Sequence, residues 1–326
     1  MRIFKKVYLK KIWKILVATF SGFINDNGLK LSASLAFYTI FSLAPLLILV
    51  ISLAGLVWGS NAAANELYPQ ISQYIGSQAA IQIQDMLKSL QLSGKTGTAV
   101  VVGVATLLIG ASSMFVEIQD SLNIIWRVKA KPKRGWVKLV QNRFLSFSLI
   151  ISLGFLLLVS LVINFLMDAL SDRIKHFLPA LTSVLFKGIN LGITLIVIST
   201  LFAIIFKVLP DVKIKWKDVR SGAIFTALLF MLGQYVISLY LQYTAQNSTY
   251  GAAGSIIVIL LWIYYTSAIL FIGAEFTQVY AEAIGNRIEP AEYAVSVRQT
   301  EIEAVVKSLP AQNPDIKGQL SKKENE

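Results

Sequence analysis

The sequence predicts an all-α, polytopic membrane protein with six transmembrane helices. Its 326 residues are 55% hydrophobic and only 15% charged, with a mean hydropathy of +0.64, which is too apolar for an ordinary soluble domain. Six apolar runs are long enough to cross a hydrocarbon core of about 30 Å at about 1.5 Å per residue. Each run must be helical because lipid offers no partner to an unpaired backbone group.

The six predicted transmembrane helices follow one another in order along the chain. They cover residues 32–58, 98–119, 144–167, 186–206, 222–243 and 255–278. A long and nearly uncharged outer loop, at about 60–97, separates the first two, and its apolar residues recur at helical spacing. Short amphipathic helices are therefore expected in this loop.

The chain divides into three predicted parts. Residues 1–30 form a cytoplasmic amphipathic N-terminal region, a basic helix on the membrane surface that the stretch NDNG at 25–28 interrupts. Residues 31–285 form the six-helix transmembrane domain. Residues 286–326 form a cytoplasmic tail, which is expected to contain a helical stretch that ends at about Leu309 and to be disordered beyond it.

Lysine and arginine set the predicted orientation. Of the 30 basic residues, 25 lie in the N-terminal 30 residues, the loops 127–143 and 207–220, and the tail from Arg287. Basic loops stay on the cytoplasmic side, so both termini are predicted to be cytoplasmic. The formal net charge of +12 is thus a topology signal that also meets anionic headgroups, and nucleic acid is not an expected partner.

The second predicted helix carries small and polar residues along one face. Nearly all are three or four residues apart, the spacing of one helical face: Gly103, Thr106, Gly110, Ser113, Glu117, Asp120 and Arg127. Small residues let neighbouring helices approach closely, and acids in a membrane helix turn away from lipid. The stripe is either a packing seam that ends in an ion pair or part of a polar pathway.

The first and sixth predicted helices also carry polar groups at depth. Pro45 has no amide to donate to the carbonyl of Phe41, which predicts a kink near the middle of the first helix. Aromatic residues in the sixth helix lie too deep for an interfacial belt. The predicted substrate route, or alternatively helix-packing motif, comprises Tyr38, Ser42, Pro45, Gly110, Ser113, Trp262 and Tyr264.

Acidic residues near two helix ends predict an ionic layer at the inner membrane boundary. Glu275 lies about 30 Å along the sixth helix from Ser255, at about 1.5 Å per residue. Glu117 reaches the same level in the second helix. We expect Glu117, Asp120, Arg127 and Glu275 to meet there and to tie these two helices together.

The sequence contains no catalytic or metal-binding signature. One histidine and no cysteine exclude thiolate and histidine-rich metal centres. GKTGT at 94–98 ends like a phosphate-binding loop, but Ser89 stands where the first glycine is required. No enzymatic activity, catalytic residue, metal or cofactor is therefore predicted.

Three stretches of the chain are distinctive: ASLAFYTIFSLAPLLIL at 33–49, EIQDSLNIIW at 117–126 and YGAAGSIIVILLWIYYTSAILFIGAEF at 250–276. They resemble the bacterial YihY/virulence factor BrkB family, in order over about 30–285. The resemblance implies a multi-pass protein of the bacterial plasma (inner) membrane. The residues of this chain that match the family's motifs are Tyr38, Ser42, Pro45, Glu117, Tyr250, Gly251, Trp262, Tyr264, Gly273 and Glu275.

The resemblance implies a function in the bacterial cell envelope. The family once carried a ribonuclease BN label that is regarded as a misassignment, and this sequence offers no metal constellation for a two-ion nuclease. Members are associated with serum resistance and with proposed export of lipid or lipopolysaccharide. The first hypothesis is a transporter or flippase of an envelope lipid or other amphiphile, with membrane lipids as partners. The alternative is a structural or adaptor protein that docks an envelope protein, in which the polar seams serve packing only.

Overall fold

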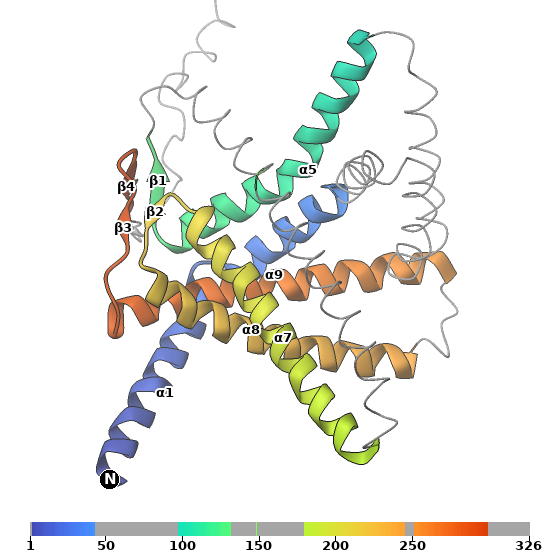
Figure 1. Ribbon diagram of the computed structural model, residues 1–326. Helices are drawn as coiled ribbons and strands as arrows, with labels where there is room; N and C mark the ends of the chain where they lie inside the picture. The colour runs from blue at the N-terminus through green and yellow to red at the C-terminus, as the bar shows by residue number, and fades with distance from the viewer. Residues whose placement is uncertain (1, 43–96, 132–147, 149–178, 245–250, 299–326) are drawn as a thin grey trace, which may run out of the picture. The chain divides into compact units, whose positions relative to one another are not determined.

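The computed structural model describes residues 2–42, 97–131, 148, 179–244 and 251–298. Most of these residues are helical (Figure 1). The helices are α1 (Arg2–Asn25), α5 (Gly97–Ile125), α7 (Pro179–Val208), α8 (Trp216–Thr244) and α9 (Gly251–Ala283). The strands are β1 (Val128–Ala130), β2 (Val212–Lys213), β3 (Glu289–Pro290) and β4 (Ala294–Ser296).

Three helices of the described part are long and apolar enough to cross a membrane: Gly188–Val208 in α7, Trp216–Val236 in α8 and Leu260–Ala283 in α9. They overlap the predicted spans 186–206, 222–243 and 255–278, with ends that differ by two to seven residues. α5 covers the predicted span 98–119 and continues to Ile125. Nearly all of the predicted span 144–167, most of 32–58, the loop 60–96 and the end of the tail lie outside the described residues.

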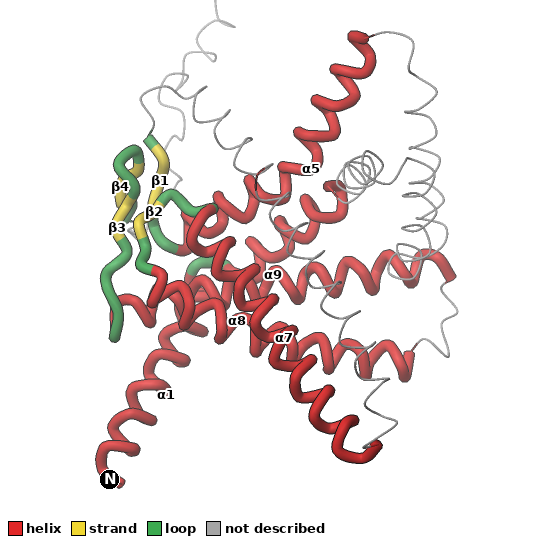
Figure 2. Tube along the Cα trace, viewed as in Figure 1, coloured by secondary structure: helices red, strands yellow, loops and turns green. Residues whose placement is uncertain are grey.

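The described residues also include four short strands (Figure 2), and the all-α prediction did not anticipate them. β1 pairs antiparallel with β4, placing Val128 opposite Ser296, and β2 pairs antiparallel with β3, placing Val212 opposite Pro290. The described part of the tail, residues 286–298, is not helical. Pro290 has no amide to continue a helix, and residues 289–290 and 294–296 pair instead with the segments that follow α7 and α5. The remainder of the tail to Leu309, where a helical stretch is predicted, lies outside the described residues.

The helix break predicted at NDNG is confirmed. α1 ends at Asn25, and Asn27 has a φ of 55°, in the left-handed region that asparagine tolerates better than most residues. The amide of Asp26 donates to the carbonyl of Gly22 at 2.8 Å, which closes the last turn of α1. The chain is helical again over 28–42, so two helices meet at this turn.

α1 presents apolar side chains on two faces. Ile15 and Phe23 are buried, and α1 packs against α9. A second row, spaced by three or four residues, is exposed and comprises Trp13, Val17, Phe20 and Ile24. Exposed lysines at 10, 11 and 14 lie near its beginning. An apolar row flanked by lysine is typical of a helix at the membrane surface, as the sequence predicts for this region.

α8 and α9 pack through two reciprocal glycine–threonine contacts. A Cβ added to Gly222 would collide with the Thr277 side chain, and one added to Gly273 would collide with the Thr226 side chain. Thr226 donates its hydroxyl to the carbonyl of Gly222, and Thr277 donates to that of Gly273, each at 2.7 Å. Small residues let the two backbones approach closely, so this seam fixes the antiparallel pair.

Buried apolar residues gather where the helices approach the strands. Leu122 and Ile125 of α5, Phe206 of α7 and Phe271 of α9 are fully buried there. Other parts of the described helices expose large apolar side chains, including Ile196, Leu228, Leu232 and Leu261. Such a surface is expected of helices that face lipid and further helices. The core thus holds the helix ends near the strands, and the polar groups described next lie among these ends.

Candidate functional site

The candidate site is centred on Glu275, an acid within the apolar part of α9. Its side chain is 3% exposed and lies against α1 at Gly22. A Cβ added to Gly22 would lie 2.7 Å from Oε2 of Glu275, which is closer than packed atoms approach. Glycine at position 22 therefore makes room for a carboxylate between the two helices.

Asp26 and Arg127 are the close charged companions of Glu275. Arg127 Nη2 lies 3.1 Å from Asp26 Oδ1, and the two side chains are 50% and 9% exposed. Asp26, Arg127 and Glu282 all act electrostatically on Glu275. We call Asp26, Arg127 and Glu275 the acidic junction, in which Asp26 pairs with Arg127 and both act electrostatically on Glu275.

One oxygen of the acidic junction is left without a partner. Oε1 of Glu275 is buried and accepts no hydrogen bond from any described residue. A buried carboxylate oxygen with no donor is costly and is rare in folded proteins. The oxygen is therefore able to accept one further hydrogen bond.

Backbone geometry places Arg127 in the junction. α5 ends at Ile125, and Arg127 adopts a φ of 54° in the following turn. This turn takes Arg127 away from the helical stripe that includes Glu117 and Asp120. The indole Nε1 of Trp126 donates to the carbonyl of Ala274 at 3.0 Å, which fixes the end of α5 beside Glu275.

The predicted ionic layer is divided between two places in the structure. Arg127 and Glu275 come together, joined by Asp26, which sequence reasoning did not select. Glu117 is half-buried and Asp120 is exposed; the two interact with each other electrostatically. Among the described residues, neither forms a hydrogen bond or an ion pair with Arg127 or Glu275.

The predicted route residues lie in several environments. Tyr38 is 42% exposed, whereas Ser42 is buried and its hydroxyl has no hydrogen-bond partner among the described residues. Ser113 donates to the carbonyl of Ile109 at 2.8 Å in its own helix. Gly110 and Tyr264 are half-buried, and Pro45 lies outside the described residues.

Trp262 belongs to an aromatic cluster between α8 and α9. Its ring centroid lies 5.5 Å from that of Phe230 and 6.3 Å from that of Tyr265, and Tyr265 packs over Gly233. Packing of this kind explains why a tryptophan is found well inside a membrane helix. No described contact joins Trp262 to Tyr38 or Ser42.

A second buried acid, Asp211, forms a polar cluster that sequence reasoning missed. It is 2% exposed and accepts hydrogen bonds from Gln119 at 3.1 Å, Asn123 at 3.0 Å and the Tyr293 hydroxyl at 3.0 Å. Its amide donates to Asn123 at 2.9 Å, and its carbonyl accepts from the amide of Ala291 at 3.0 Å. We call these residues the Asp211 clamp.

The Asp211 clamp joins α5, the loop after α7 and the segment after α9. The signal in the sequence is two amides four residues apart at 119 and 123, which share one face of α5. Their common acceptor lies 88 residues or more away in sequence, and no local pattern identifies it.

Metal binding receives no support from the described residues. Within the ranges 2–42, 97–131, 179–244 and 251–298, no group of three or more His, Cys, Asp or Glu side chains is arranged to hold a metal ion.

Comparison with known proteins identifies relatives that match most of the chain. The UPF0761 membrane protein PA0951 of Pseudomonas aeruginosa is 28% identical over 255 residues, which is 77% of this chain and 59% of the relative. The protein Mpe_A1422 of Methylibium petroleiphilum is 25% identical over 289 residues, or 85% of this chain and 64% of the relative. The ribonuclease-like protein YfkH of Bacillus subtilis is 25% identical over 259 residues, or 78% and 91%.

These relatives differ from the chain in length. The chain spans about three fifths of the Pseudomonas relative, whereas it spans nearly all of YfkH. No solved structure matches the chain. The sequence profile of the virulence factor BrkB family matches residues 19–297, and the chain therefore belongs to this family of membrane proteins.

Proposed function

We propose that the protein is a carrier that moves an envelope lipid, or another amphiphile, across the membrane. The observation that supports this function best is the acidic junction, in which buried Glu275 keeps one unpartnered oxygen inside a helix long enough to span a membrane. Ionisable residues within membrane helices are costly and commonly belong to substrate or ion pathways.

The arrangement of charges suits an amphiphile with a polar head. Half-exposed Arg127 offers guanidinium donors to a phosphate or carboxylate, and the unpartnered oxygen of Glu275 accepts a hydrogen bond from a hydroxyl or an ammonium group. The exposed apolar row of α1 leads along the membrane surface to this point. A headgroup that carries both an anion and a donor fits both partners.

Transport in liposomes tests the proposal. The full chain is reconstituted with a fluorescent phospholipid, and an impermeant reductant measures how fast the label leaves the inner leaflet. Wild-type protein is expected to accelerate this movement, and Glu275→Gln is expected to slow it by about tenfold, because one charged hydrogen bond in a buried site contributes roughly that factor.

Glu292→Gln is the matched control for this experiment. Glu292 is an exposed acid after α9 that pairs with Lys213 and is not among the groups that act on Glu275, so the change removes the same charge without altering the acidic junction. The control should retain the wild-type rate. If wild-type protein moves lipid no faster than empty liposomes do, the protein is not a lipid carrier.

A structural or adaptor role is the second candidate, and the seam between α8 and α9 favours it. The reciprocal contacts of Gly222 with Thr277 and Gly273 with Thr226 leave no room between these helices. A bundle closed in this way suits a protein that holds a partner rather than one that opens. A folded protein that moves no lipid in the liposome experiment would support this second function.

A further inference from the structure

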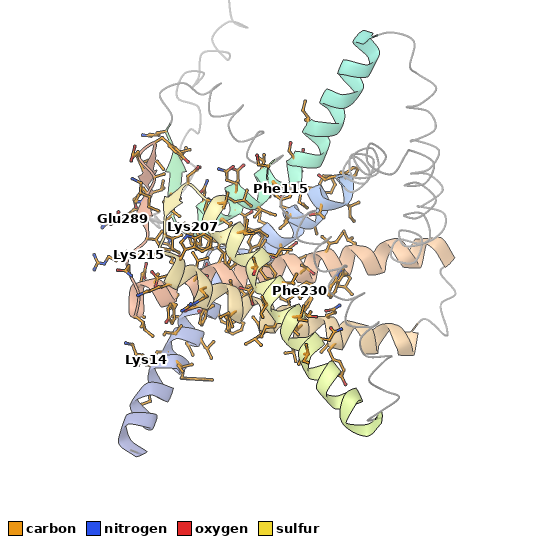
Figure 3. All side chains as sticks on the ribbon, in the orientation of Figure 1. Lys14, Phe115, Lys207, Lys215, Phe230 and Glu289 are labelled. Carbon is orange, nitrogen blue, oxygen red and sulfur yellow. The ribbon has the colours of Figure 1, made fainter. Side chains whose placement is uncertain are left out.

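A basic cavity of about 460 Å³ lies beyond the ends of the membrane spans, apart from the acidic junction. Its charged lining comes from two segments: Lys213 and Lys215 precede α8, and Arg287 and Glu289 follow α9. Figure 3 shows Lys215 and Glu289 beside the strands and Lys207 on α7. Phosphate groups are the common ligands of such clusters of lysine and arginine.

The cavity lies beside the ends of three helices that are long and apolar enough to cross a membrane. The span in α7 ends at Val208, that in α8 begins at Trp216, and that in α9 ends at Ala283. Every lining residue lies within about seven residues of one of these ends, so all three helices place the cavity at the same membrane face. Trp216 is 59% exposed, as is usual for a tryptophan at the boundary between lipid and water.

Free donors remain at the basic side chains. Arg287 has no hydrogen bond or ion pair to any described residue, and its guanidinium has five N–H donors. Lys215 donates to Asn286 Oδ1 at 2.6 Å, and Lys213 donates to Glu292 at 2.9 Å. Each lysine has three N–H donors, so two remain on each ammonium for a ligand.

The wall of the cavity is held in place from inside the protein. Asp218 is 2% exposed and accepts a hydrogen bond from the amide of Asn286 at 3.2 Å. A Cβ at Gly285 would collide with the same carboxylate. The buried acid thereby fixes the turn that carries Arg287, so the cavity is a built feature of the fold.

We propose that this cavity binds the phosphate of an anionic phospholipid headgroup in the adjoining leaflet. Lys213, Lys215 and Arg287 provide three positive charges, and Glu289 and Glu292 offset two of them. One net charge remains, and a basic residue near an anionic membrane surface contributes about a fivefold change in affinity. This inference is independent of the carrier function, because binding a headgroup requires no transport.

Lipid binding by the full chain tests the proposal. Protein stripped of lipid in a neutral detergent is titrated with phosphatidylglycerol or phosphatidylcholine, and bound lipid is counted by native mass spectrometry. Wild-type protein is expected to prefer phosphatidylglycerol roughly fivefold, as one net basic charge predicts. The variant Lys213→Gln/Lys215→Gln/Arg287→Gln is expected to lose that preference.

The matched control removes the same charge elsewhere. Lys129, Lys131 and Arg298 are exposed and do not line the cavity, so their triple change to glutamine should keep the wild-type preference. Arg287→Gln alone has no described hydrogen bond to break. It should fold as the wild type does and lose part of the preference, which keeps the test valid if the triple variant unfolds.

Inorganic phosphate separates the two sources of the ligand. Binding of inorganic phosphate is measured by calorimetric titration. If the triple variant loses phosphate binding but wild-type protein shows no preference between the two lipids, the cavity is a phosphate site and the lipid is not the source of its ligand. An equal preference for phosphatidylglycerol in wild type, triple variant and control would overturn the site itself. Loss of preference in the triple variant alone would establish it.

Discussion

Asp211 and Glu275 are both almost fully buried, with 2% and 3% of their surfaces exposed, but their surroundings differ. Asp211 accepts three side-chain hydrogen bonds and uses its backbone groups as well. Glu275 faces a second acid and a half-exposed arginine, and its Oε1 has no donor among the described residues. Two acids that are buried to the same extent therefore differ in how completely they are paired, and only Glu275 keeps a carboxyl oxygen without a donor among the described residues.

The largest expected effect is on the Asp211 clamp. Asp211→Ala leaves Gln119 and Asn123 without their shared buried acceptor, and each orphaned buried donor is costly. We expect the free energy of unfolding to fall by about 3 kcal/mol, measured by thermal unfolding of the purified protein in detergent.

Glu275→Gln is the counterpart that sharpens this comparison. Replacing a poorly paired buried acid by a neutral isostere should change stability by less than about 1 kcal/mol or increase it. Equal losses from Asp211→Ala and Glu275→Gln would show that both acids are structural.

Gly22→Ala is expected to have a smaller effect, and its sign should depend on residue 275. In the wild-type background the new methyl group presses on the Glu275 carboxylate, and overpacking destabilises by about 1 kcal/mol or more. In a Glu275→Ala background the clash is absent, and the higher helix propensity of alanine should stabilise by up to about 1 kcal/mol.

The measurement for Gly22 is a double-mutant cycle from chemical or thermal unfolding. A reversal of sign between the two backgrounds identifies the carboxylate as the group that requires glycine. The same cost in both backgrounds would mean that α1 meets another part of α9 at this point.

The ion pair of Arg127 with Asp26 should contribute less. The arginine side chain is 50% exposed, so solvent screening limits the pair to about 1 kcal/mol or less. Asp26→Arg and Arg127→Asp should each lower the melting temperature slightly, and the double exchange should restore it.

Charge-exchange variants also show which acid is the main ion-pair partner of Arg127. The sequence analysis predicts that exchanging the charges of Glu275 and Arg127 restores stability. The 3.1 Å contact predicts instead that exchanging the charges of Asp26 and Arg127 restores it. If only the Glu275 exchange restores stability, Glu275 is the main partner of the arginine.

The smallest expected effect is at Glu292, a fully exposed acid. Its hydrogen bond with Lys213 lowers the pKa of Glu292 and raises the pKa of Lys213. The stabilisation from Glu292 is present above the ordinary carboxyl pKa and is lost as the pH falls through the lowered value. The stabilisation from Lys213 is lost only as the pH rises through the raised lysine value.

Melting temperatures as a function of pH test this pair. The difference between wild type and Glu292→Gln should be small at neutral pH and should vanish in acid, where Glu292 is protonated in both states. A difference that persists in acid would mean that the glutamate acts by packing.

Sequence patterns predicted the apolar helices well and the polar contacts less well. The spans at 186–206 and 255–278 are continuous apolar runs, and any such run must become helix in lipid. The clamp escaped prediction because Asp211 meets Gln119 and Asn123 across about 90 residues of chain. Asp26 was not predicted because it lies in a break between helices, where helical periodicity does not indicate which way a side chain points.

The sequence by itself determined the class of protein, the positions of three helices that can cross a membrane and the family, since hydropathy and local motifs are properties of neighbouring residues. Only the tertiary structure decided which polar groups meet. The positive φ of Arg127 takes this residue out of the α5 stripe to Asp26, and Gly22 admits Glu275. Partners of this kind depend on how helices cross, and the crossing is set by side chains far apart in the chain.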